Sequence, residues 1–466
     1  MAEKALKNIK PKATFTEGSL FKNIILFSLP LMASQILQVL FNISDVIVVG
    51  KGVENSTIPV GAVGSTSTLL TLFTGFLIGL GAGINVKTAQ YLGANKKKDV
   101  KETVDTSLII SALSGVVIFV ICFTLARPML SLLNTKPELL DKAVTYFKIF
   151  SLGMPALAIF NYGNGVLSAA GDTKRPLIYL TVSGLLNIAL NFFFVLVCRI
   201  DVEGVATASV ITQYISAIAV IVRLVRIKEA HRLDFKTFTV SGKKSLEVIA
   251  LGVPAGIQNG IFAVANIFIQ VGINKFTYKQ VTGINTAQNA DTIIYNVMSA
   301  FYTACSTFIG QNYGAGKRDR MIKSYYVTSL YAFIFGLLLG AFAFFKGDLF
   351  LRLFTEDPEV IAAGMEKFKV MGFSFCVSAF MDNSIAASRG IGKSLAPTII
   401  VILGSCVFRV VWIYTVFAHF NTIPSLFLLY PVSWIITAIA ETTYFFVSLK
   451  KSKPTVATVA VPAENN

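Results

Sequence analysis

The chain has 466 residues, of which 54% are hydrophobic and only 14% are charged. Its mean hydropathy is +0.68. Soluble globular domains carry about 25% charged residues, so the composition excludes an ordinary soluble fold. The net charge of +16 does not indicate a nucleic-acid partner, because the basic residues are sorted by loop and are not gathered on one domain.

Apolar segments follow one another along almost the whole chain. Residues 1–22 are polar and lysine-dotted, without the apolar core and cleavage site of a signal peptide, and we expect a tail there. Twelve segments follow, each long enough for a helix to cross a hydrocarbon core, which takes about 20 residues. We therefore predict an all-α membrane protein of twelve transmembrane helices, at 23–49, 58–86, 104–126, 144–168, 177–198, 204–225, 246–274, 281–309, 324–345, 361–387, 395–418 and 425–448.

The second half of the chain repeats the first. The two copies are offset by the number of residues that separates Pro137 from its equivalent, Pro358. At this offset QYLGANKKKDV (90–100) falls on QNYGAGKRDRM (311–321). Six helices per unit make a parallel repeat, in which both halves enter the membrane in the same direction. The predicted fold is two pseudo-symmetric six-helix lobes. The expected divisions are an N-terminal tail 1–22, an N-lobe 23–225, a linker 226–245, a C-lobe 246–449 and a C-terminal tail 450–466.

The distribution of Lys and Arg predicts the orientation. With the N-terminus inside, the inside segments hold 28 of the 41 basic residues, whereas the outside loops hold nine. Positive loops stay in the cytoplasm, so we expect both tails and the linker to be cytoplasmic. The predicted location is the inner, or plasma, membrane.

The first helix carries a polar stripe. Gln35, Gln38, Asn42 and Asp45 are spaced by three, four and three residues, which places them on one helical face. Such a face avoids lipid, so it either hydrogen-bonds to a partner helix or lines a cavity. A buried carboxylate neutralises or finds a cation. Asp45 is therefore the predicted carrier of a proton or ligand of Na⁺.

The fifth and sixth helices add neutral oxygen ligands. Asn187 and Asn191 lie one turn apart on the same face, and the sixth helix carries Thr207, Ser209, Thr212 and Gln213. Amide, hydroxyl and carboxylate oxygens are the ligands that hard cations prefer. The pattern permits a cation site and equally permits polar packing.

Further polar residues lie in the predicted spans, and we treat them as candidates for a substrate cavity between the lobes. Together with the first-helix residues Gln35, Gln38 and Asn42, they are Asn161, Asn164, Asn259, Gln288, Asp291, Asp382 and Arg409.

Two charged groups of the second half stand at positions related to polar residues of the first. The repeat places Asp382 at the position of Asn161, and Arg409 beside that of Asn187. A lone intramembrane arginine is costly, so we expect an Asp382–Arg409 ion pair, whose functional version opens on proton or substrate binding. Glu441, near the end of the last helix, is expected to be an interfacial or pairing residue.

In combination, several segments resemble the multidrug and toxic compound extrusion (MATE) family. The resemblance covers roughly residues 20 to 450, closest to the bacterial and archaeal branch with an acidic residue on helix 1. It is carried by FNISDVIVVG around Asp45, QYLGANKKKD, AAGDTKRPL (169–177), LLNIALNFFFV (185–195) and STFIGQNYGAGKRDR (306–320).

The resemblance implies a V-shaped pair of six-helix lobes and efflux driven by H⁺ or Na⁺. It assigns Asp45 to coupling, with Asn187, Asn191 and Thr212 beside it. The family has a carboxylate where this chain has Asn191, which disfavours Na⁺ relative to H⁺. Another branch has a glutamate on the seventh helix, where this chain has no acid between Val248 and Asn274. Coupling is therefore expected in the N-lobe, with Na⁺ as the one metal ion considered, at Asp45, Asn187, Asn191 and Thr212.

The predicted function is secondary active efflux of small amphipathic, cationic molecules in exchange for H⁺ or Na⁺. The transporter is expected to act as a monomer in the lipid bilayer, with no cofactor besides the coupling ion. The alternative is a flippase for lipid-linked precursors from the related superfamily. A major facilitator transporter is disfavoured because the loop after helix two lacks GxxxDRxGRR, and an enzyme is disfavoured because no nucleophile–base or metal set exists.

Overall fold

The computed structural model describes residues 15–52 and 57–452, without the side chains of residues 42, 43, 45–52 and 57. Within these ranges eleven helices are long and apolar enough to cross a membrane. A twelfth span is formed by two helices that meet at a bend of 46°. The all-helical, twelve-span prediction is therefore confirmed.

The first six spans form one group of helices, the N-lobe. The fourth of these spans is the bent pair α5 and α6, and the fifth ends in a short π-helical segment, η1. The bounds are α2 (Leu20–Gly52), α3 (Thr57–Gly93), α4 (Lys97–Leu132), α5 (Pro137–Ser151), α6 (Met154–Ala169), α7 (Lys174–Phe192), η1 (Phe193–Val197) and α8 (Val202–Arg226).

The last six spans form the second group, the C-lobe, after a linker with one 3-10 turn, η2 (Phe235–Thr237). The tenth, eleventh and twelfth spans are interrupted. The bounds are α9 (Gly242–Ile273), α10 (Tyr278–Gly314), α11 (Arg318–Leu351), α12 (Pro358–Met371), η3 (Gly372–Ser374), α13 (Phe375–Gly390), α14 (Leu395–Val401), η4 (Ile402–Val407), α15 (Phe408–Trp412), η5 (Ile413–Phe417), α16 (Ala418–Phe420), α17 (Ile423–Phe427) and α18 (Leu429–Lys451).

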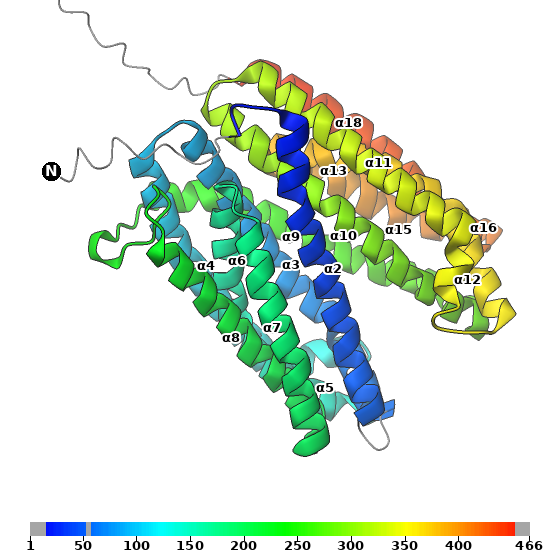
Figure 1. The fold of residues 1–466 in the computed structure, drawn as a ribbon. Coiled ribbons are helices and arrows are strands. Elements are labelled where there is room, and N and C mark those ends of the chain that lie inside the picture. Colours follow the sequence, from blue (N-terminus) through cyan, green and yellow to red (C-terminus); the bar gives the residue numbers. More distant parts are fainter. Residues whose placement is uncertain (1–14, 53–56, 453–466) are drawn as a thin grey trace, which may run out of the picture.

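The two groups lie close together near the start of α2 and diverge toward the other end, as Figure 1 shows. We call the end where they meet the basic end, because it carries the loops at 94–96, 227–241 and 315–317. The opposite end, with the loops at 133–136, 274–277 and 352–357, is called the far end.

The repeat predicted from the sequence recurs in the backbone. Proline is the first residue of both α5 and α12, where its fixed φ suits a helix start and its missing N–H costs nothing. The turns after α6 and α13 both use a glycine with φ of 87°, Gly171 and Gly392, a conformation that is strained for other residues. These pairs share the predicted offset.

Close packing of glycines joins the lobes where α3 crosses α9. A Cβ atom added at Gly83 would lie 2.5 Å from the backbone nitrogen of Gly252, and one added at Gly79 would overlap Gly256. Glycines four residues apart lie on one helical face and let two backbones approach closely. A side chain at either level would force the lobes apart.

At the basic end, two buried glutamines close the lobes reciprocally. The Gln90 side chain in the N-lobe donates to the Gly390 carbonyl at 2.8 Å, and the Gln311 side chain in the C-lobe donates to the Ala169 carbonyl at 2.7 Å. Both donors and both acceptors are related by the repeat offset. We call these two bonds the glutamine latch.

The residues before α2 cover the glutamine latch. The Phe15 N–H donates to Gln311 Oε1 at 2.9 Å, and the Phe15 ring stacks on Phe308 with a centroid separation of 4.1 Å. Arg320 donates to the carbonyls of Glu17 and Gly18. The segment therefore fastens the start of the N-lobe to α10 and α11 of the C-lobe.

Candidate functional site

A buried amide and hydroxyl cluster lies between α7 and α8 in the N-lobe. The Asn191 side chain donates to Asn187 Oδ1 at 3.2 Å, and the Asn187 side chain donates to Ser209 Oγ at 3.4 Å. Thr212 lies one turn after Ser209 on α8 and donates to the carbonyls of Ala208 and Ser209. All four side chains of this amide cluster, Asn187, Asn191, Ser209 and Thr212, are buried.

The predicted proton carrier, Asp45, lies on α2, but its side chain and that of Asn42 fall outside the described residues. The backbone still gives its level. The ring of Phe41 on α2 sits against Gly184 of α7, where a Cβ atom would overlap it. Both helices run from the basic end to the far end, so position 45 and Asn187 each lie about one turn beyond this contact.

The remaining N-lobe candidates are less closely grouped. On α2, Gln35 is half-buried and Gln38 is exposed. On α6, Ser168 donates to Asn164 Oδ1 at 3.3 Å, and the Asn161 side chain donates to the Leu157 carbonyl of its own helix. Neither asparagine bonds to the amide cluster in the described part of the molecule.

Asn259 lies at the boundary between the lobes. Its side chain on α9 donates to the Gly75 carbonyl of α3 at 2.9 Å. This bond lies one turn from the glycine crossing and places a candidate cavity residue in a lobe contact.

The C-lobe contains a buried ion pair that the sequence reading missed. Lys367 on α12 is fully buried, and its ammonium lies 2.7 Å from an Asp291 carboxylate oxygen on α10. It also donates to Gln288 Oε1 at 2.7 Å and lies 5.0 Å from the centroid of the Phe427 ring. The signal in the sequence was a lysine inside an apolar segment. Its partners, Asp291 and Gln288, were already candidates for the substrate cavity.

The predicted ion pair between Asp382 and Arg409 is wrong for the described structure, because no contact within 4.0 Å joins them. The buried Arg409 Nε donates to Ser433 Oγ at 3.3 Å, and its guanidinium lies over the rings of Tyr430 and Phe262, at 4.4 and 5.7 Å from their centroids. Aromatic faces attract the cation, and they take the place that the carboxylate was expected to fill.

One further expectation is corrected at the basic end of the C-lobe. There, Arg389 of α13 donates to Gln258 Oε1 at 2.7 Å. Glu441 was expected at an interface or in a pair, but it is fully buried and neither carboxylate oxygen has a hydrogen-bond partner in the described structure.

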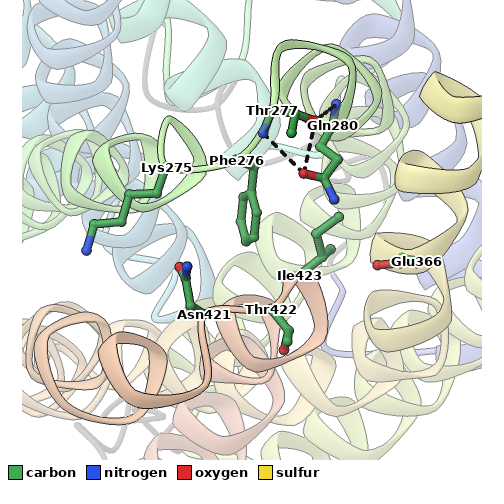
Figure 2. A pocket seen from close by; sticks show the side chains of 8 residues that line it. All are labelled: Lys275, Phe276, Thr277, Gln280, Glu366, Asn421, Thr422 and Ile423. Carbon is green, nitrogen blue, oxygen red and sulfur yellow. Dashed lines mark hydrogen bonds between the residues drawn. The ribbon is translucent and has the colours of Figure 1, made fainter.

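A separate pocket of about 370 Å³ opens at the far end of the C-lobe. Figure 2 shows it between the α9–α10 turn, which carries Lys275 and Phe276, and the α16–α17 turn, which carries Asn421 and Thr422. Glu366, next to Lys367 in sequence, lies on the third side. The pocket therefore adjoins the helix that carries the buried ion pair, and it is distinct from the N-lobe amide cluster.

Comparison with known proteins gives consistent results. A family model described as MatE matches residues 30–193 and 254–415, one match in each lobe. The probable multidrug resistance protein YpnP of Bacillus subtilis (strain 168) is 26% identical over 382 residues, covering 81% of this chain and 84% of that protein. The probable multidrug resistance protein NorM of Thermotoga maritima is 24% identical over 408 residues, or 84% of each chain.

Solved structures agree in fold. One described as the outward-facing conformation of a multidrug resistance MATE family transporter of the MOP superfamily superposes with a TM-score of 0.87 at 21% identity. The match covers 95% of this chain and all of that chain.

Proposed function

The chain belongs to the MatE family, whose members are transporters and not enzymes, and from this premise we propose that it is a secondary active efflux transporter. It exports small amphipathic, cationic molecules in exchange for H⁺ or Na⁺ by alternating access. The similarity to proteins named as multidrug resistance proteins supports efflux as the direction.

The observation that carries the coupling proposal is the buried amide cluster at the level of Asp45. Asn187 and Asn191 hydrogen-bond to each other and to Ser209 inside the N-lobe. These groups are neutral, so Asp45 is the acidic member of the proposed coupling set. A carboxyl that moves between a water-filled and a buried setting changes its proton affinity, which is what coupling requires.

Proton coupling is favoured over Na⁺ coupling by the charge of this set. Na⁺ binding needs several oxygen ligands and gains from their negative charge. Asn187, Asn191 and Thr212 offer neutral oxygens, so Asp45 alone balances the charge of a bound ion. A proton needs one carboxylate and no coordination shell.

The orientation proposal rests on charge. The basic end carries the loops rich in Lys and Arg, and positive loops remain in the cytoplasm. We therefore place both termini in the cytoplasm and the protein in the inner, or plasma, membrane. The glutamine latch closed at that end supports our proposal that this conformation is outward-open, and we propose that the transporter acts as a monomer.

The test is dye efflux from proteoliposomes with pH and Na⁺ gradients imposed separately, using ethidium as the cationic probe. We expect the pH gradient to drive efflux and the Na⁺ gradient to add less than about twofold. Efflux driven by Na⁺ alone would reverse the ion assignment. Scrambling of a fluorescent lipid without dye transport would favour the flippase and overturn the proposal.

A further inference from the structure

Glu441 is an acidic group in the C-lobe that the proposed coupling set does not use. Its side chain on α18 is 0% exposed, and both carboxylate oxygens are buried without a hydrogen-bond donor in the described part of the chain. An ionised carboxylate in such a place has lost its hydration and gained nothing in return. The arrangement favours the neutral, protonated carboxyl in this conformation.

Two charged groups, both on α13, interact electrostatically with the Glu441 carboxyl. They are Arg389 and Asp382, and neither forms an ion pair with it within 4.0 Å in the described structure. Arg389 instead donates from Nη2 to Gln258 Oε1 of α9 at 2.7 Å, while its Nε atom is buried without a partner. The guanidinium thus has donor capacity left for a carboxylate.

The position of Arg389 connects this cluster to the closed basic end. The next residue, Gly390, supplies the carbonyl that accepts one bond of the glutamine latch from Gln90. Gln258 belongs to α9, the helix that crosses α3 through the lobe glycines. A movement of Arg389 would therefore act on two of the contacts that hold the lobes together, the glutamine latch and the glycine crossing.

We propose that Glu441 is a second proton-binding carboxyl, protonated when the basic end is closed and ionised when that end is open. On losing its proton to the cytoplasm, the carboxylate draws Arg389 away from Gln258 and forms an ion pair with it. This movement weakens the bond between Gln90 and Gly390 and stabilises the open basic end. The inference rests on the proposed transport function only in that the lobes must alternate.

Proton linkage gives the size of the expected effect. If the closed state binds one proton more than the open state, the equilibrium constant for opening rises up to about tenfold per pH unit. A glutamine at position 441 keeps the shape of a protonated glutamate but cannot ionise. It should hold the basic end closed and remove the pH dependence.

The experiment measures the separation of spin labels at Lys98→Cys and Lys323→Cys, on opposite lobes at the basic end, across pH in a background without native cysteines. We expect the open population to rise with pH in the parent protein, and to vary less than about twofold in Glu441→Gln. The exposed Glu366→Gln serves as the matched control and should titrate like the parent. A Glu441→Gln protein that still titrates normally would overturn the proposal.

A second measurement does not require transport, and its decisive reading is made on the parent protein. Infrared spectra of the parent protein in the closed state should contain the carbonyl band of a buried protonated carboxyl that disappears in Glu441→Gln. Arg389→Gln should retain this band to higher pH, because the carboxylate has lost its partner. Absence of the band in the closed parent protein would contradict the proposal. A parent protein that shows the band but no ion-driven dye efflux would contradict only the proposed function.

Discussion

The two lobes share a backbone plan but differ in the chemistry of their interiors. In the N-lobe, the described buried cluster between α7 and α8 consists of neutral amides and hydroxyls. In the C-lobe, Lys367, Asp291, Arg409 and Glu441 are all buried. The repeat therefore preserves the turns and the lobe contacts and leaves the polar interior free to diverge.

We infer from this difference that the two lobes have different roles in transport. A neutral cluster beside one carboxyl gives that carboxyl a large energetic effect when it changes protonation. A set of opposite charges instead holds its members in place, because removing one leaves another buried and unpaired. We expect N-lobe substitutions to affect coupling and C-lobe substitutions to affect stability and the closed basic end.

The largest expected effect is in the N-lobe. Asp45→Asn should abolish ion-driven efflux while leaving folding and some substrate binding intact, because the amide keeps the shape of the side chain and loses the titrating group. The measurement is ethidium efflux from proteoliposomes under a pH gradient. The exposed Asp141→Asn is the control and should transport normally, and parental rates in Asp45→Asn would remove the basis for N-lobe coupling.

In the C-lobe, Lys367→Met should destabilise the fold by about 3–5 kcal/mol, since Asp291 is left buried without its cation. The double variant Lys367→Met with Asp291→Leu should recover most of that loss. The reporter is the free energy of unfolding in mixed detergent micelles.

The partly exposed Lys279, which pairs with Asp357 and Glu359, provides the comparison. Lys279→Met should cost much less stability than Lys367→Met, because solvent screens this pair. Equal losses at Lys367 and Lys279 would show that burial of the pair is unimportant and that the lobes do not differ as argued.

The contact between Phe15 and Phe308 allows a test at the boundary of the lobes. Phe15→Ala removes a buried ring worth about 1.5–3 kcal/mol from a site that exists only while the basic end is closed. The open population should rise by roughly tenfold or more, as reported by labels at Lys98→Cys and Lys323→Cys. Phe21→Ala, at a half-exposed ring, should have little effect, and no shift in Phe15→Ala would mean that the segment does not fasten the lobes.

The sequence predicted the helices and the repeat well because these follow from long apolar runs and from repeated Pro, Gly and Gln positions. The same offset that relates Gln90 to Gln311 reappears as the glutamine latch. Spacing on one helix also placed Asn187 and Asn191 one turn apart on one face, where the structure joins them by a hydrogen bond.

Contacts between helices were harder to predict. The expected partner of Arg409 was Asp382, yet the arginine lies against Tyr430 and Phe262. Lys367 and Arg389 were missed because sequence spacing gives the face of a helix but not what lies opposite it. The interruptions η3, η4 and η5 rotate the residues that follow onto other helix faces. The apolar pattern of the sequence does not predict these interruptions.

The smallest expected effect concerns His231, a buried group on the N-lobe side. We expect burial to keep its side chain neutral. His231, in the linker, is buried and its Nδ1 atom has no partner in the described structure. Burial lowers the pKa of this imidazole below its ordinary value of 6.5, against the opposing influence of Glu229 and Asp172. The folded protein therefore binds this proton less readily than the unfolded chain does.

The sign of the pH dependence follows from that difference. The contribution of His231 to stability is fully present above the unfolded pKa near 6.5 and is lost as the pH falls below it, by less than about 1.4 kcal/mol per pH unit. Between about pH 5 and 8, the protection of the linker amides against hydrogen exchange, with the intrinsic exchange rate at each pH divided out, should fall toward acid in the parent and change less in His231→Gln. The exposed His419→Gln replaces the second of the two histidines and should leave the acid response unchanged. If His419→Gln instead removed the acid response, the response would not come from the buried His231. The argued difference between the neutral N-lobe side and the charged C-lobe interior would then lose this support.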